Sequence, residues 1–315
     1  MSNEERDMIK LGVIGMSPGN AHPYSWSSII NGTFDGEEIS RLGYPAVTNY
    51  LEANKDTLGI PGAEVACVWT QERSISESIA KTCNISRIVD NLEDMIPWVD
   101  AVLLCRDDPE NHVAMAKPFL DARIPLFVDK PLAITMKDLH YFSEENAKGK
   151  FLMSCSSMRY ANECRIVKQE INALGKLELA TAVGKKDWKK YGVHLLEALF
   201  SLLDDPRLAF VKYTGKTDKD IVHIEFENGL QATVHLFMDI SSTFQLSLFG
   251  QQGWRLIDIK NSYSMFRDTI IEFIRSVQEG ASRLSFDKTE NIIRTLIAAN
   301  ESKKQSGATI DMSKF

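Results

Sequence analysis

Two side chains in this sequence are suited to exchanging a proton with a substrate, those of Lys130 and His194. A lysine that is partly removed from water releases its proton more easily, and an imidazole titrates near neutral pH. Lys130 follows the apolar run Pro125–Val128, and Pro131 restricts it to extended backbone, which aims its side chain. General acid–base catalysis needs such a group, which gives a proton to a reacting atom or takes one from it. The sequence leaves open which of the two is the base.

A glycine-bearing turn near the start of the chain is suited to binding a phosphate. It follows the apolar run Ile9–Ile14 and reads Gly15-Met-Ser17-Pro18-Gly19-Asn20-Ala-His22. A dinucleotide requires small residues here, so that backbone N–H groups and a helix N-terminus can approach the pyrophosphate. Against the G-x-G-x-x-G pattern, Gly15 keeps the first position, while Ser17 and Asn20 replace the other two glycines. The alternatives are an ordinary strand-to-helix turn and a G-x-S-x-G hydrolase elbow, the latter disfavoured because few residues precede the strand.

The first half of the chain alternates short apolar runs with amphipathic stretches. Such runs are typical of strands buried on both faces of a parallel sheet, and the stretches between them predict crossover helices. The expected strands are Ile9–Ile14, Glu64–Trp69, Asp100–Cys105, Pro125–Val128 and Phe151–Ser154, and the expected helices are Tyr44–Asn54, Ile75–Cys83, Asn111–Ala122 and Met136–Lys148. We therefore predict an α/β fold with a Rossmann-type doubly wound parallel sheet, a dinucleotide-binding domain over residues 1–155.

The pattern changes near residue 160. After a helix at about 162–173, two alternating runs flank Asn228-Gly229, which is a strong hairpin signal. The expected strands are Ile221–Phe226, Gln231–Phe237, Ser247–Phe249 and Trp254–Ile257, and the closing helices are Met265–Gln278 and Lys288–Ser306. Residues 156–315 are thus predicted to form an α+β domain with an open, mostly antiparallel sheet.

Several motifs occur here in a combination that one known family shares. They are Asp100–His112, Asp129-Lys130-Pro131, Ser157–Tyr160 and Tyr191–Glu197. The sequence resembles the glucose–fructose oxidoreductase, inositol dehydrogenase and rhizopine-catabolism (Gfo/Idh/MocA) family, whose Glu-Lys-Pro signature reads Asp-Lys-Pro here. The resemblance covers nearly the whole chain, and the combination is specific although no single motif is.

The resemblance implies an NAD(P)-dependent dehydrogenase or reductase that acts on the CH–OH group of a sugar, sugar derivative or cyclitol. Lys130 and His194 would be its catalytic residues. The cofactor would be bound by Gly15, Ser17, Pro18, Gly19, Asn20, His22, Thr70, Arg73, Asp107, His112, Asp129 and Lys130, and the substrate by Arg159, Lys190, Tyr191 and His194. The open sheet would cover the nicotinamide, build the substrate pocket and join subunits into a homodimer or homotetramer.

One position departs from the family's pattern. In the family this histidine ends an Asp-x-x-x-His motif, whereas the position four before His194 is Lys190 here. Another side chain, such as Glu197 or Asp187, would then have to orient the imidazole. Together with the altered glycine turn, this departure leaves a second hypothesis open: a protein that binds a dinucleotide without turnover and acts as a sensor or partner.

The end of the second expected strand bears on the choice of cofactor. Thr70 stands where an NAD-specific site has an acidic residue, and Arg73 could pair with a 2′-phosphate. This favours NADP slightly, while Glu72 keeps NAD open.

The four lysines within residues 184–191 are suited to a cationic wall for an anionic substrate or to a solvated loop. Arg159 is suited either to such an anion or to a structural ion pair.

The composition of the 315 residues, 44% hydrophobic and 25% charged, is that of a soluble two-domain protein. A net charge of −7 offers no basic surface to nucleic acid. The polar start and the lack of a long apolar run predict neither a secretion signal nor a membrane span. The five cysteines form no CxxC pair and no histidine pair has metal-ligand spacing, so we predict a cytoplasmic protein without a catalytic metal.

Overall fold

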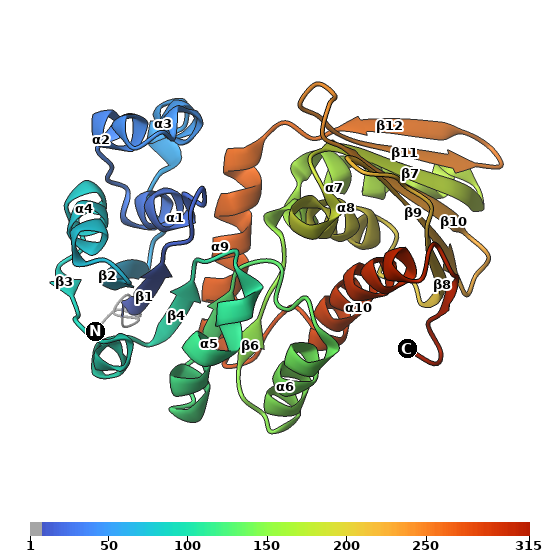
Figure 1. Ribbon diagram of the computed structural model, residues 1–315. Coiled ribbons are helices and arrows are strands. Elements are labelled where there is room, and N and C mark those ends of the chain that lie inside the picture. Colours follow the sequence, from blue (N-terminus) through green and yellow to red (C-terminus); the bar gives the residue numbers. More distant parts are fainter. Residues whose placement is uncertain (1–7) are drawn as a thin grey trace. The chain divides into compact units, whose positions relative to one another are not determined.

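The computed structural model describes residues 8–315, which divide into two compact units (Figure 1). The first unit comprises residues 8–133, 140–154 and 266–286. The second unit comprises residues 134–139, 155–265 and 287–315. The chain therefore passes between the units several times, and one of these passages falls at residues 154 and 155.

The first unit is built on a six-stranded parallel sheet, which confirms the predicted doubly wound fold. Its strands are β1 (Ile9–Gly15), β2 (Ala63–Thr70), β3 (Arg87–Ile88), β4 (Ala101–Leu104), β5 (Leu126–Val128) and β6 (Leu152–Met153), in the order β3-β2-β1-β4-β5-β6. Leu11, Val13 and Ile14 are fully buried, as expected of a central strand covered on both faces. The strand order reverses between β1 and β4, and ligands of such sheets bind at the carboxyl edge beside this point.

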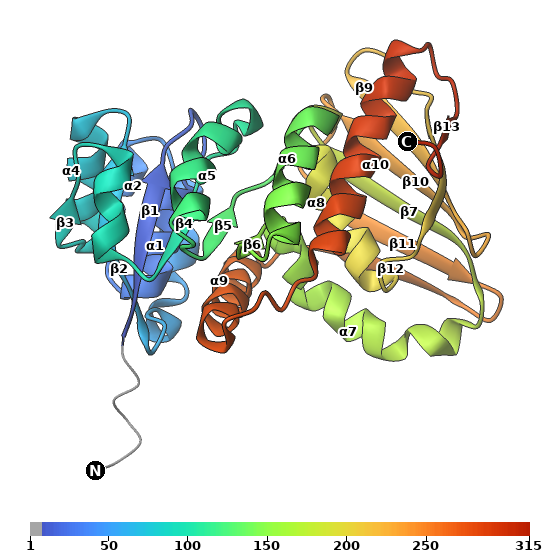
Figure 2. The same cartoon turned by 90° about the horizontal axis from the view of Figure 1, so that it is seen from below.

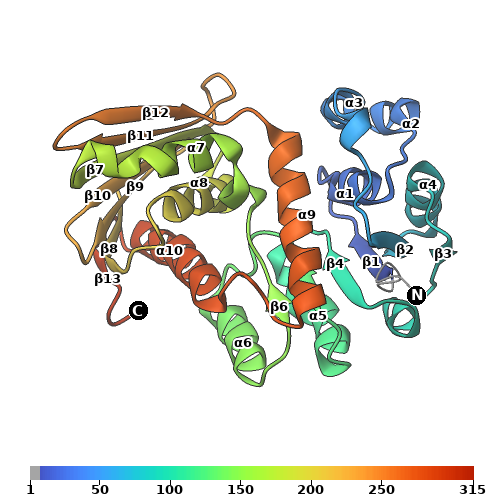
Figure 3. The same ribbon diagram turned by 180° about the vertical axis from the view of Figure 1, so that it is seen from behind.

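Helices pack along this sheet. The helices α1 (His22–Asn31) and α4 (Arg73–Cys83) contact β2 and each other, and α5 (His112–Asp121) contacts β4 and β5. The ring of Phe273 in α9 (Ser262–Glu279) lies 5.7 Å from that of Phe127 in β5, so α9 packs on the same sheet (Figure 3). Between α1 and β2 the chain forms α2 (Gly36–Arg41) and α3 (Pro45–Glu52), where the sequence predicts one helix. Residues 136–147 form α6 (Met136–Ala147).

The second unit contains an open seven-stranded sheet, as predicted for this part of the chain. Its strands are β7 (Leu177–Lys185), β8 (Leu208–Tyr213), β9 (Lys219–Phe226), β10 (Gln231–Phe237), β11 (Phe244–Gly250), β12 (Trp254–Asp258) and β13 (Ile310–Asp311), in the order β12-β11-β7-β10-β9-β8-β13. Only β7 and β10 pair in parallel, and the other pairs are antiparallel. The helices α8 (Trp188–Leu202) and α10 (Phe286–Lys304) lie on one face of the sheet (Figure 2), and α7 (Asn162–Glu170) contacts β12.

The largest difference from the predicted elements lies at residues 177–202. The sequence pattern predicts no strand or helix there, but the structure has β7 followed directly by α8. The lysines that indicated a loop end β7 and begin α8, where the Asp187 side chain caps the helix by accepting the Lys190 N–H at 3.0 Å. Most of α8 beyond its first turn is buried, so it lacks the polar face by which an amphipathic helix is recognised.

Candidate active site

The turn between β1 and α1 leaves room for a phosphate beside its glycine. Gly19 has a φ of 81°, which residues with a side chain rarely adopt. No atom lies within 4 Å of the position that a Cβ at Gly19 would take. The Asn20 N–H donates to the Ser17 carbonyl oxygen at 3.1 Å, which closes the turn ahead of α1. A backbone that is open on one side and leads into a helix N-terminus fits the pyrophosphate of a dinucleotide.

The carboxylate of Asp129 holds this turn to the end of β5. It accepts hydrogen bonds from Asn20 Nδ2 at 3.0 Å and from the Lys130 N–H at 2.8 Å, and it pairs with His22 Nδ1 at 2.6 Å. Burial alone would raise the pKa of Asp129, but the neighbouring charges of His22 and Lys130 hold it well below its usual range. Asp129 is 1% exposed. Its contacts therefore connect two segments of the site, and a direct contact with the cofactor stays a prediction.

Replacing Asp129 with asparagine is expected to lower the free energy of unfolding by about 2–3 kcal/mol at neutral pH, because a charged acceptor of buried hydrogen bonds is lost. The low pKa of Asp129 in the folded state means that its contribution is complete above a pH of about 4, the ordinary value of an aspartate. That contribution is lost as the pH falls below this value. Urea unfolding of both proteins should therefore show a difference in stability that shrinks in acid. Asp121→Asn, at an exposed carboxylate on α5, is the control, and an equal loss in both variants would contradict the assignment.

Lys130 lies at the carboxyl end of β5, next to the carboxylate that follows β4. Its Nζ is 3.6 Å from Asp107 Oδ2, and the Ser17 hydroxyl donates to Asp107 Oδ1 at 2.5 Å. The Lys130 residue is only 9% exposed. Side chains of Ser17, Asp107 and Lys130, from three loops at one edge of the sheet, thus meet, and their contacts with a cofactor stay predictions. The arrangement places a partly desolvated side-chain amine at the edge where ligands of parallel sheets bind.

His112 occupies the interior of the first unit. Its two ring nitrogens lie 2.9 Å from the Arg106 carbonyl oxygen and 3.0 Å from that of Leu132, and the residue is fully buried. Burial lowers the pKa of His112. These contacts connect the loop after β4 to the segment after the Asp-Lys-Pro signature, and a role in binding the cofactor stays a prediction. Sequence analysis missed Arg106, which pairs with Asp108 and donates to the Met16 carbonyl oxygen at 3.3 Å.

The end of β2 has a closed network of polar groups. The Thr70 hydroxyl donates to the Glu72 carbonyl oxygen at 2.6 Å and lies 2.8 Å from Ser76 Oγ, and Thr70 is buried. Arg73 is exposed and pairs with Asp90 and with a second carboxylate one turn further along α4. A 2′-phosphate would thus have to replace carboxylates as the partner of Arg73.

In the second unit, the His194 ring lies among aromatic side chains and one hydroxyl. His194 Nδ1 is 2.6 Å from Ser156 Oγ. The Tyr191 ring lies 5.1 Å from the imidazole, and the Phe244 ring lies 6.4 Å from it. Neither Glu197 nor Asp187, the expected orienting groups, makes this contact: Asp187 caps α8, and Glu197 accepts the Ser156 N–H at 3.2 Å. Ser156 was missed because nothing in the sequence marks it beyond its place before the motif Ser157–Tyr160.

Arg159 forms a buried ion-pair network. Its Nε donates to Glu197 Oε2 at 2.5 Å, and its two terminal nitrogens donate to the Asp205 carboxylate at 2.8 and 3.1 Å. Burial would lower the pKa of the guanidinium, but the two carboxylates raise it above its usual value. Lys288 Nζ also lies 3.1 Å from Asp205. Of the two roles that the sequence left open, the contacts found here are those of the structural ion pair, and substrate binding by Arg159 stays a prediction.

The remaining predicted substrate residues lie in the first turn of α8. Lys190 is exposed, and the Tyr191 ring is parallel to that of Phe244 at 5.9 Å. Lys186 Nζ lies 4.7 Å from the centre of the Tyr191 ring, a cation–π contact. A cation and an aromatic face thus lie beside the His194 ring, and binding of a polar or anionic ligand there stays a prediction.

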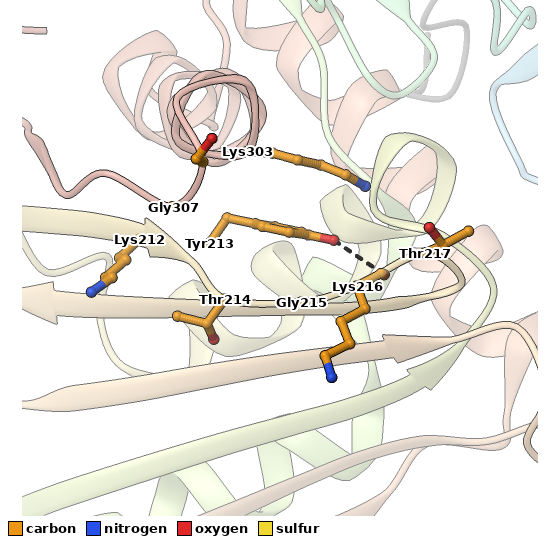
Figure 4. Close-up of a pocket in the computed structure, with 9 residues that line it drawn as sticks. Lys212, Tyr213, Thr214, Gly215, Lys216, Thr217, Lys303 and Gly307 are labelled. Atoms are coloured by element: carbon orange, nitrogen blue, oxygen red, sulfur yellow. Dashed lines mark hydrogen bonds between the residues drawn. The ribbon is translucent and has the colours of Figure 1, made fainter.

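A separate cavity of 490 Å³ in the second unit is lined by residues 212–217 and by the end of α10 (Figure 4). The Tyr213 hydroxyl, which lies across it, is 2.7 Å from Asp220 Oδ1 and 3.4 Å from the Lys216 carbonyl oxygen, while the side chains of Lys212 and Lys216 extend in different directions. Lys303, which also lines the cavity, is paired with Asp220 at 2.9 Å. None of the predicted site residues lines this cavity, and its cations do not converge on one point.

Two structural properties bear on the class of the protein. Over residues 8–315, no helix combines the length and the apolar composition needed to cross a membrane. Within the same residues, no three or more histidine, cysteine, aspartate or glutamate side chains are grouped as metal ligands would be.

Comparisons with known proteins agree with this fold. Residues 39–154 match a family described as an oxidoreductase family with an NAD-binding Rossmann fold. No curated protein matches the sequence. Solved structures align over almost the full chain: a probable dehydrogenase from Thermotoga maritima (TM-score 0.77, 14% identity, 97% of this chain and 99% of that one), a putative myo-inositol dehydrogenase from Sinorhizobium meliloti (0.76, 14%, 96% and 99%), and a myo-inositol dehydrogenase from Lactobacillus casei in complex with NAD(H) and myo-inositol (0.76, 16%, 97% and 97%).

The fold and the matched family define the class of this protein, an NAD-binding oxidoreductase of Rossmann type with a second, open-sheet unit. The family match over residues 39–154 and the fold shared with these solved structures confirm the resemblance to the Gfo/Idh/MocA family that the sequence motifs indicate.

Proposed function

We propose that this protein transfers a hydride between a nicotinamide dinucleotide and a secondary alcohol of a sugar, sugar derivative or cyclitol. The observation that carries the proposal is the position of Lys130, which lies 3.6 Å from Asp107 and is tied through it to Ser17 of the glycine turn. When bound, the dinucleotide supplies the acceptor or donor of the hydride. Oxidation of the alcohol breaks its C–H and O–H bonds, and the hydroxyl proton needs a group to receive it. Lys130 and His194 are the groups we assign to that proton.

The glycine turn, α1 after β1 and α4 after β2 form the part of the chain that would bind the cofactor. Residues 1–155 would form the dinucleotide-binding domain and residues 156–315 the substrate and oligomerisation domain. The substrate would meet His194, Tyr191 and Lys190, a set that combines hydrogen-bond donors with an aromatic surface. The L. casei relative was solved with myo-inositol, which supports a polyol as the class of substrate to test first.

The outer face of the open sheet is the surface we assign to subunit contact. Its edge exposes Trp254 by 62%, Leu256 by 55% and Phe249 by 40%, and Phe249 is paired with Trp254 across β11 and β12. Such neighbouring apolar side chains on one face are typical of protein interfaces. Sedimentation of the purified protein would separate a monomer from the proposed homodimer or homotetramer.

The first test is titration of the protein with NADH and NADPH, followed by quenching of its five tryptophans. Saturable binding in the micromolar range supports the proposal and selects the cofactor for a screen of sugars, sugar acids and cyclitols. Turnover would appear as a change in the absorbance of the reduced nicotinamide. No binding of either cofactor, in reduced or oxidised form, would refute the proposed enzyme. Binding without turnover on any substrate would favour the sensor hypothesis.

Cofactor choice gives a sharper prediction. We propose a preference for NADP. Thr70 stands where an acidic side chain would repel a 2′-phosphate, and Arg73, three residues further along the chain, would bind that phosphate. Arg73→Ala should then weaken NADPH binding about tenfold and leave NADH binding unchanged, since a charge-assisted hydrogen bond is lost for one cofactor only. Lys81→Ala, at the exposed end of α4, is the control. Equal weakening of both cofactors by Arg73→Ala would refute the preference.

A further inference from the structure

The contact between Ser156 and His194 joins residues that are 38 positions apart in the sequence. Ser156 immediately precedes the short 3-10 helix η4 (Ser157–Tyr160), and His194 lies in the second turn of α8. Ser156 Oγ and His194 Nδ1 are 2.6 Å apart, a short hydrogen bond. This contact therefore occupies one of the two ring nitrogens through which an imidazole can exchange a proton.

Ser156 is also held in place by hydrogen bonds to groups other than His194. Its Oγ accepts the Met158 N–H at 3.3 Å, and its backbone N–H donates to Glu197 Oε1 at 3.2 Å. Glu197 is in turn fixed by Arg159. Because Ser156 is 1% exposed, its hydroxyl has little access to water. The position of Oγ is thus set by the protein and does not depend on solvent.

The direction of the hydrogen bond follows from the groups around the hydroxyl. A serine hydroxyl has one proton to donate, and a buried donor without an acceptor is costly. Oγ already accepts from Met158, and within residues 8–315 the only acceptor in hydrogen-bond contact with the Ser156 hydroxyl is His194 Nδ1. Ser156 must then donate to Nδ1, so Nδ1 carries no proton in the neutral ring. The proton of the neutral imidazole resides on Nε2.

We propose that Ser156 is a positioning residue that fixes this tautomer of His194, in place of the aspartate that the sequence lacks at residue 190. The assignment rests on the proposed hydride transfer and separates the two proton-exchanging groups. His194, with its proton on Nε2, donates a hydrogen bond to the substrate oxygen, and Lys130 accepts the hydroxyl proton as the base. An aspartate in the same place could only accept a proton from Nδ1, which would leave Nε2 as an acceptor.

The test uses ¹⁵N-histidine NMR on the full chain without cofactor, where the His194 signal is assigned by its loss in His194→Gln. The wild-type protein is expected to show the Nε2–H tautomer with a hydrogen-bonded Nδ1. Ser156→Ala should convert this signal to a mixture of tautomers, Ser156→Thr should retain it because a hydroxyl remains, and Ser201→Ala on the same helix should not change it. A neutral ring protonated at Nδ1 in the wild type, or an unchanged signal in Ser156→Ala, would overturn the proposal.

Kinetics on the same variants would connect the tautomer to turnover. Ser156→Ala is expected to lower kcat by about tenfold, less than the 10²–10⁴-fold of a direct acid–base group because Ser156 acts through His194, with the dissociation constant of the cofactor unchanged. Threonine at this position should restore most of the rate, which a merely structural loss would not allow. An alanine variant with the wild-type kcat would overturn the positioning role. If the wild type turned over no alcohol, the proposed function would fail, but the NMR result would still decide the role of Ser156.

Discussion

Replacing Lys130 with alanine is expected to lower kcat by about 10²–10⁴-fold, the usual contribution of an acid–base group. The reason is the location of the lysine: the residue is 9% exposed, and its amino group lies 3.6 Å from Asp107 at the carboxyl end of β5. Although Lys130 is also among the expected cofactor contacts, binding of the dinucleotide should fall much less than kcat, because the Ser17–Asp107 hydrogen bond and the glycine turn do not include the lysine side chain. Steady-state kinetics on the best alcohol of the screen, together with NADPH titration, would measure both quantities.

Two further variants separate the possible causes of a rate loss. Lys130→Arg keeps the positive charge but not a readily released proton, so it should be nearly as slow as the alanine variant while binding the cofactor normally. Lys117→Ala removes an exposed lysine of α5 that pairs with Asp121, and it should leave the rate unchanged. If Lys130→Ala kept turnover within about tenfold of the wild type, the role of base assigned to Lys130 would be wrong.

The fold of the first unit could be predicted because its strands depend on local pattern. Short apolar runs predicted β1, β2, β4, β5 and β6, and Asn228-Gly229 predicted the hairpin of β9 and β10. By contrast, α8 could not be predicted, because burial on almost all sides removes the polar face that marks a helix in a sequence. The two-residue strand β3 is defined by its pairing with β2 and has no pattern of its own.

The sequence suggests the residues of the candidate site one by one, but not the contacts among them. The sequence identified Ser17, Asp107 and Lys130 separately, and the parallel sheet brings them to one edge. It did not indicate that Asp129, assigned to the cofactor, pairs with His22 inside the first unit. Contacts of this kind depend on side-chain directions at the ends of different strands, which no spacing along the chain encodes. The Ser156–His194 contact was missed for the same reason.

Replacing Arg159 with methionine is expected to lower the free energy of unfolding by about 3–5 kcal/mol, the cost of removing one partner from a buried ion pair. The guanidinium is the partner of Glu197, which is 1% exposed, and of Asp205. Without Arg159, Asp205 keeps Lys288, whereas among residues 8–315 Glu197 keeps only the Ser156 N–H. Urea unfolding at neutral pH measures the loss. Arg255→Met, which breaks an exposed pair with Glu170, should cost no more than about 1 kcal/mol.

The loss in Arg159→Met should also depend on pH, in a direction that identifies its cause. Burial raises the pKa of Glu197, and Arg159 is the charge that opposes this. In the variant, the folded state therefore binds a proton at Glu197 more tightly than the unfolded state does, so its stability falls as the pH rises above the ordinary glutamate value of about 4. The difference from the wild type should be smallest in mild acid and largest at neutral pH. A variant with wild-type stability but a raised KM would instead assign Arg159 to the substrate, and the buried network would not be the reason for its presence.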